Sequence, residues 1–150
     1  MKLILLPIIL PVVTALLVLI TPQAWRRARE ALSILAVVLN LICAIVLFKA
    51  TAVFQIPWLG FGMEFKLRLY QFSGFIMLAA AFFSACVCLY SLSFMRQKTG
   101  HKQFYSYLLI TLAFTNAAVL ADNLILMLFF WEGLLLTLFG MIGLPGDFQP

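Results

Sequence analysis

The sequence predicts an all-α membrane protein with five transmembrane helices and an extracytoplasmic β-hairpin between the second and third helices. Hydrophobic residues make up 65% of the 150 residues, charged residues make up only 10%, and the mean hydropathy is +1.14. This composition provides too little polar surface to cover a soluble globule. Most charged residues lie between apolar runs, as expected when those runs are embedded in lipid. We therefore expect residues 1–150 to form a single transmembrane domain.

Each apolar run is close to the roughly 20 residues that a hydrocarbon layer of about 30 Å demands. The runs cover residues 1–20, 30–48, 72–95, 104–121 and 123–143. Pro11 removes one helical hydrogen bond from the first run and should bend its helix, and Pro22 ends it. The first run is too long for the apolar core of a signal peptide and lacks a small-residue cleavage pattern, so we expect it to stay in the membrane.

The connection at residues 49–71 contains the pattern of a β-hairpin. Residues 63–69 alternate between apolar and polar side chains, which is typical of a strand with one buried face. Residues 53–59 provide a partner strand, and Gly60-Phe61-Gly62 provides a turn. Because open sheet edges are not tolerated in lipid, the hairpin should lie on the outer surface with its apolar side covering protein. An irregular amphipathic loop is the alternative.

Positive charge predicts how the chain is oriented. Six of the ten basic residues fall in the linkers after the first and third runs, and four fall on the opposite face. The six are Arg26, Arg27, Arg29, Arg96, Lys98 and Lys102. The positive-inside rule then places the N-terminus outside and the C-terminus in the cytoplasm. The net charge of +5 indicates this topology and contact with anionic lipid headgroups, not binding of nucleic acid.

Glu132 is an acidic residue in the middle of the run at residues 123–143. It lies about nine residues, or roughly 14 Å of helix rise, from the preceding turn and so near the bilayer midplane. An ionised carboxylate at that depth is costly, which favours a function in proton transfer. A protonated glutamate that holds a neighbouring helix is the alternative. The small residues Gly133, Thr137 and Gly140 would let another helix come near the acid.

Asn116 and His101 are further candidates for a proton path. Asn116, Thr111 and Thr115 all lie in the run at residues 104–121. Apart from the run that contains Glu132, this is the only one in which we expect a polar group well inside the membrane. An asparagine there also suits an interhelical hydrogen bond. His101 lies in the inner basic loop next to Lys102, where an imidazole can collect protons or simply be solvated.

The cysteines give no sign of a metal or redox centre. Cys43, Cys86 and Cys88 lie inside apolar runs without the paired spacing of a zinc or iron-sulfur site. We interpret them as small packing residues. No cofactor motif and no metal site is expected, so any redox chemistry would belong to other subunits.

Several different short motifs are spread along the chain, from the first apolar run to the fifth. They are Leu6-Pro7 with the residues up to Leu19, Pro57-Trp58-Leu59-Gly60, Phe72-Ser73-Gly74, residues 90–95, residues 96–105, and Asn123-Leu124 through Phe130-Trp131-Glu132. Together they resemble the N-terminal part of the antiporter-like membrane subunits of respiratory complex I, Mrp-type antiporters and energy-converting membrane hydrogenases. The chain departs from the family pattern at Tyr70-Gln71, where an acid is frequent, and at Thr137, where a proline is common.

The resemblance implies a function for Glu132. In that family the matching glutamate pairs with a lysine on a later helix and couples to a proton pathway. No apolar run here contains a lysine, arginine or histidine, apart from Lys2 at the start of the chain. The partner lysine is therefore expected to come from a neighbouring subunit.

Family members continue for several more helices, so the resemblance implies either a truncated relative or one piece of a split subunit. Our leading hypothesis is a membrane subunit of a multi-subunit ion-translocating complex in a bacterial or archaeal cytoplasmic membrane. One alternative is a scaffold subunit without its own ion path, and another is a self-sufficient transporter formed by several copies of the chain. The sequence leaves the driving reaction and the transported ion, H⁺ or Na⁺, open.

Overall fold

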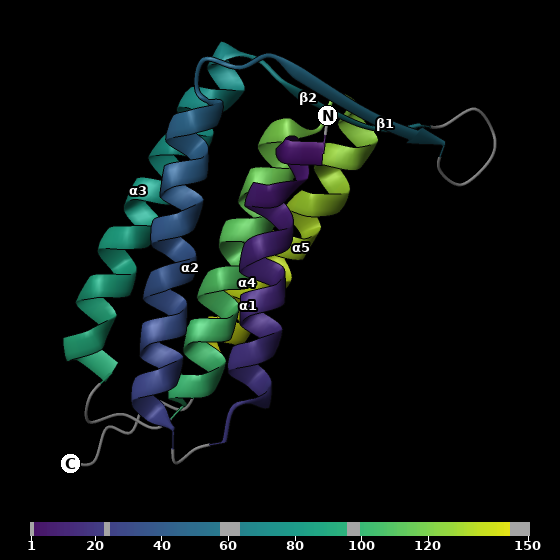
Figure 1. Ribbon diagram of the computed structural model, residues 1–150. Coiled ribbons are helices and arrows are strands. Elements are labelled where there is room, and N and C mark those ends of the chain that lie inside the picture. Colours follow the sequence, from purple (N-terminus) through teal and green to yellow (C-terminus); the bar gives the residue numbers. More distant parts are fainter. Residues whose placement is uncertain (1, 23–24, 58–63, 96–99, 145–150) are drawn as a thin grey trace.

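The computed structural model describes residues 2–22, 25–57, 64–95 and 100–144, which fold into five long helices and one β-hairpin (Figure 1). A short 3-10 helix at Lys2–Leu5 leads into the first helix. The long helices are α1 (Leu6–Ile20), α2 (Arg26–Leu47), α3 (Gln71–Phe94), α4 (His101–Leu120) and α5 (Leu124–Ile142). Each of these segments, with the 3-10 turn added to α1, is long and apolar enough to cross a membrane. The predicted fold class is confirmed.

Local chemistry explains where the helices begin and end. Thr21 is extended with ψ 128° and ends α1, because a residue that precedes a proline disfavours the helical region. α2 begins at Arg26, before the predicted start at residue 30, and the Arg26–Glu30 ion pair supports this extra turn. Asn123 caps α5 by accepting a hydrogen bond from the Leu126 amide at 2.7 Å.

α4 is the central helix of the bundle, because it packs against α1, α3 and α5, while α2 lies beside α3 (Figure 1). Its alanines allow these close approaches, since Ala113 and Ala117 are buried to 1% and 0% exposure. Ala81 is equally buried on α3. The outer surfaces of α1, α2, α3 and α5 instead expose large apolar side chains, as a protein surrounded by lipid requires.

The hairpin consists of β1 (Ala52–Pro57) and β2 (Glu64–Leu69), which pair antiparallel with Phe54 opposite Leu67. It lies across one end of the bundle (Figure 1). Leu67 and Leu69 are 0% and 2% exposed and join the core that also contains Ile4 and Leu120. The predicted hairpin with one buried face is therefore confirmed, whereas its turn at residues 60–62 lies outside the described residues. The extracytoplasmic side remains a prediction.

Asp122, in the turn between α4 and α5, contacts the hairpin through a hydrogen bond and ion pairs. Its amide donates to the Lys66 carbonyl at 2.9 Å. Its carboxylate also lies 3.0 Å from the Lys66 ammonium and 3.5 Å from Nε of Arg68. These contacts tie the turn from which α5 begins to the hairpin.

Candidate functional site

Glu132 lies in the middle of α5 on an exposed face of the chain. Leu128, Leu135 and Leu136 are near it at helical spacing and are 49%, 55% and 72% exposed. Trp131 is also exposed, at 56%. The carboxyl group thus stands in an apolar stripe that the rest of the chain does not cover.

The neighbouring face of α5, roughly 80–140° around the helix from Glu132, holds the small residues that were expected to admit another helix. That helix is α4, because Thr111 donates to the Thr137 hydroxyl at 3.0 Å. A Cβ added to Gly140 would come within 2.6 Å of the Tyr107 ring, and one added to Gly133 within 2.9 Å of the Phe114 ring. The small-residue face is therefore filled from within the chain. Glu132, about 100° away from Gly133 around the helix, is left facing outward.

Within the described ranges, no hydrogen bond or ion pair reaches Glu132. The ion pairs there include Arg26 with Glu30, and Lys66 and Arg68 with Asp122. All of these groups lie at helix ends or on the hairpin, away from the middle of α5. A positively charged partner for Glu132 would thus have to come from outside residues 2–22, 25–57, 64–95 and 100–144.

Asn116 lies inside the bundle in a polar cluster that joins three helices. Its side-chain amide donates to the Pro7 carbonyl on α1 at 2.9 Å and to Oδ1 of Asn40 on α2 at 3.2 Å. Asn40 donates to the same Pro7 carbonyl at 2.8 Å. Both asparagines are fully buried. The cluster exists because Pro11 has no N–H, so the carbonyl four residues before it has no helical donor.

The sequence expectation missed Asn40. Asn116 was expected to make its run the only one besides that of Glu132 with a polar group well inside, and that expectation is wrong. Asn40 lies deep in α2, whose apolar run is as long as the others. The sequence did contain a signal for Asn40. A buried side-chain amide requires an acceptor, and Pro11 leaves the Pro7 carbonyl on another helix without its helical donor.

One polar atom of this cluster has no hydrogen-bond partner among the described residues. It is Oδ1 of Asn116, which is buried. The amide cannot simply be turned around, because its oxygen would then face the Pro7 carbonyl and Oδ1 of Asn40, which are both acceptors.

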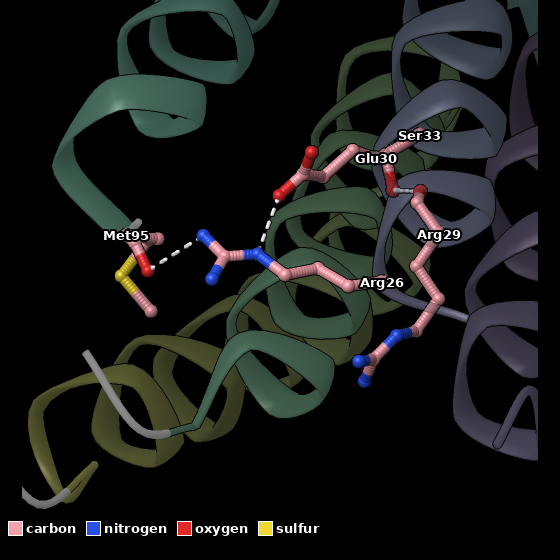
Figure 2. A network of polar contacts seen from close by, with 5 residues as sticks. All are labelled: Arg26, Arg29, Glu30, Ser33 and Met95. Atoms are coloured by element: carbon pink, nitrogen blue, oxygen red, sulfur yellow. Dashed lines mark hydrogen bonds and ion pairs between the residues drawn. The ribbon is translucent and has the colours of Figure 1, made fainter. Parts of the chain in front are cut away.

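His101 begins α4 at the opposite end of the bundle from the hairpin. Both ring nitrogens are buried and lack hydrogen-bond partners within the part of the chain that the structure describes. Three charged residues of α2, namely Arg26, Arg29 and Glu30, are close enough to act electrostatically on it. Figure 2 shows Arg26 reaching between Glu30, at 2.9 Å, and the Met95 carbonyl, at 3.3 Å. The sequence-predicted proton-path residues therefore occupy three separate places: Glu132 outside, Asn116 in the core and His101 at a helix end.

Similar proteins were found by sequence and by structure, while no protein-family profile matches the chain. The Na(+)/H(+) antiporter subunit A1 of Staphylococcus aureus is 29% identical over 139 residues, which covers 88% of this chain and 17% of that protein. The subunit A1 of Staphylococcus aureus strain JH9 has the same identity and coverage. The chain thus spans only about a sixth of the length of these curated relatives.

A solved structure supplies the matching fold. It is the membrane-bound sulfane sulfur reductase, an archaeal respiratory membrane complex, with a TM-score of 0.72, 18% identity, and coverage of 96% of this chain and 23% of that chain. The sequence similarity to antiporter subunits and the shared fold together confirm that this chain resembles the antiporter-like membrane subunits.

Proposed function

We propose that this chain is a membrane subunit of a multi-subunit ion-translocating complex and that Glu132 belongs to its proton path. The observation that carries the proposal is an acidic side chain at the middle of a membrane-spanning helix on a face that the chain leaves open. An ionisable group at this depth is costly unless it faces protein or water. A neighbouring subunit that covers this face and supplies a lysine meets that requirement.

The similarity to Na(+)/H(+) antiporter subunits supports the assignment to an ion-translocating assembly. Fold similarity to a chain of a respiratory membrane complex is compatible with it. A carboxyl group next to a lysine can exchange a proton when the distance between the two changes, and so couple charge movement to proton transfer. Glu132 supplies the acidic half of such a pair, and Asn116 and His101 would be accessory groups.

The test is a carboxyl-to-amide substitution in the assembled complex. The complex is purified through a tag on this chain, reconstituted into vesicles, and assayed for ion-driven pH change with an internal dye. Glu132→Gln is expected to reduce transport to background, because the amide cannot bind and release a proton. Glu64→Gln, an exposed carboxyl on β2, is the matched control and should transport normally. Normal transport by an assembled Glu132→Gln complex would refute the proposal.

A scaffold subunit without an ion path is the second candidate. The observation that favours it is the use of Asn116, whose donors are both occupied in holding α1, α2 and α4 together. Infrared difference spectra of the working complex distinguish the two functions. A carboxyl band that disappears in the Glu132→Gln variant and changes during turnover supports proton transfer, whereas a band that stays constant supports the scaffold.

A further inference from the structure

The polar cluster of Pro7, Asn40 and Asn116 does not satisfy all of its own hydrogen-bonding groups. Each side-chain amide has two N–H donors, and each carbonyl oxygen has two lone pairs. The Pro7 carbonyl accepts from Asn40 at 2.8 Å and from Asn116 at 2.9 Å, and the second N–H of Asn116 donates to Oδ1 of Asn40 at 3.2 Å. Oδ1 of Asn116 has no donor among the described residues. One N–H of Asn40 also remains, because the described residues give this amide a single acceptor.

The depth of Oδ1 of Asn116 limits what can reach it. Both asparagines are 0% exposed. Leu112 and Leu120 lie one turn to either side of Asn116 on the same face of α4 and are each 1% exposed. A buried acceptor without a donor costs free energy comparable to a lost hydrogen bond. A partner for this oxygen must therefore be small enough to be enclosed within the bundle.

Small side chains border the two asparagines on their own helices. Ala113 lies three positions before Asn116 and is 1% exposed. Ala36 and Ala44 lie four positions to either side of Asn40 and are 3% and 0% exposed. Residues three or four positions apart are neighbours on a helix surface. A ligand held between these helices is thus bordered by methyl groups, which occupy little space and take no part in hydrogen bonding.

Water is the small ligand that matches the remaining groups. It can donate to Oδ1 of Asn116 and can also accept an N–H, whereas a metal cation would bind the oxygen but not the N–H. Buried waters usually make about three hydrogen bonds to polar groups that the protein itself does not satisfy. The hydroxyl nearest in sequence does not serve as the donor, because Thr115 donates to the Thr111 carbonyl at 2.8 Å.

We propose that an internal water molecule binds in this cluster and donates a hydrogen bond to Oδ1 of Asn116. The water then acts with the two asparagines in holding α1, α2 and α4 together. The site is independent of Glu132, which faces outward from α5, and so it does not rest on the proposed function.

Nuclear magnetic resonance of the full chain in detergent tests the proposal. The chain has three asparagines, Asn40, Asn116 and Asn123, so ¹⁵N-labelled asparagine gives three side-chain amide signals, which single substitutions assign. A water that stays bound longer than the protein takes to tumble gives a nuclear Overhauser cross-peak of the same sign as contacts within the protein. Rotating-frame spectra separate this cross-peak from chemical exchange. We expect it at Asn116 and not at Asn123, which is exposed.

Thr115→Val is the matched control on the same helix. A hydroxyl proton that exchanges with water is another source of such a cross-peak, and this variant removes the hydroxyl next to Asn116 in sequence. The cross-peak at Asn116 should remain unchanged. Its disappearance from folded Thr115→Val, verified by circular dichroism, would assign it to the hydroxyl and overturn the proposal.

Infrared spectra of Asn116→Asp provide a second measurement. A carboxyl group at this depth is expected to be protonated, because an ionised one is costly there. Its C=O group takes the place of Oδ1, and the stretching frequency of a protonated acid falls when this oxygen accepts a hydrogen bond. A difference spectrum against Asn116→Leu isolates the band. We expect the frequency of a hydrogen-bonded acid.

Three further results would overturn the proposal. One is the absence of a water cross-peak at Asn116 in the folded wild type. Another is an Asn116→Asp band at the frequency of a free acid. A saturable shift of the Asn116 signals when sodium chloride replaces choline chloride, without a water cross-peak, would make the ligand a cation and not water.

Discussion

The side-chain amide of Asn116 donates to the Pro7 carbonyl at 2.9 Å, although the two residues are 109 positions apart. This contact is a consequence of the proline at position 11. Pro11 removes the donor that the Pro7 carbonyl would have in a regular helix, and the membrane interior offers no water to replace it. Asparagines from α2 and α4 supply the replacement donors.

Asn116→Leu should therefore destabilise the bundle. We expect a loss of about 1 kcal/mol in the free energy of unfolding, the usual size of an interhelical hydrogen bond in a membrane protein. The loss is modest because Asn40 still donates to Pro7 and because the unpartnered Oδ1 of Asn116 disappears as well. Unfolding of the chain by titration with sodium dodecyl sulfate measures this change. No loss of stability would show that the cluster does not hold the helices together.

Pro11→Ala should reduce the effect of that substitution. An alanine N–H at position 11 would donate a hydrogen bond to the Pro7 carbonyl and so replace the hydrogen bond from Asn116. In a double-mutant cycle, we expect Asn116→Leu to cost about 1 kcal/mol less in the Pro11→Ala background than in the wild type. Strictly additive effects would contradict the link between the proline and the two asparagines.

The contact between α4 and α5 can be tested at Gly140. A Cβ there would lie 2.6 Å from Cζ of Tyr107, so Gly140→Ala must displace the tyrosine ring. Gly74→Ala is the matched control, because its Cβ would sit at an ordinary 3.5 Å from the Phe48 carbonyl oxygen. Gly140→Ala should be less stable than Gly74→Ala by about 1–3 kcal/mol. Adding Tyr107→Ala should restore part of the loss, and equal stabilities of the two glycine variants would argue against the packing.

Asp122→Asn should loosen the hairpin without unfolding the bundle. It removes the partner of Lys66 and Arg68, but these groups are partly exposed and the Asp122 amide still donates to the Lys66 carbonyl. A loss of at most about 1 kcal/mol is expected, and it should shrink at high salt. Hydrogen exchange of the β2 amides checks this. Unchanged exchange at low salt would mean that the ion pairs contribute nothing to docking.

Glu132→Gln should leave the stability of the chain itself within about 0.5 kcal/mol of the wild type, because exposed side chains without partners contribute little. The same detergent titration measures it. A large loss would show that Glu132 supports the fold of this chain. Any defect of the variant in transport could then not be assigned to proton transfer alone.

The helices and the hairpin could be predicted because each leaves a local signal. Twenty apolar residues in a row can satisfy their backbone groups in lipid only as a helix, and the alternation at Phe65, Leu67 and Leu69 matches the two faces of a strand. The early start of α2 was missed because arginines at a helix end look like a loop by hydropathy, although they form helix well.

The sequence alone determined that this chain crosses the membrane and that an acid lies at the middle of its last described helix. Only the tertiary structure decided which way each helix faces: Asn40 and Asn116 inward to Pro7, and Glu132 outward. The physical reason is that lipid is as apolar as a protein core, so a membrane helix is apolar all around and its hydropathy does not mark the buried side. That side is set by where small residues and hydrogen-bonding groups of separate helices fit together.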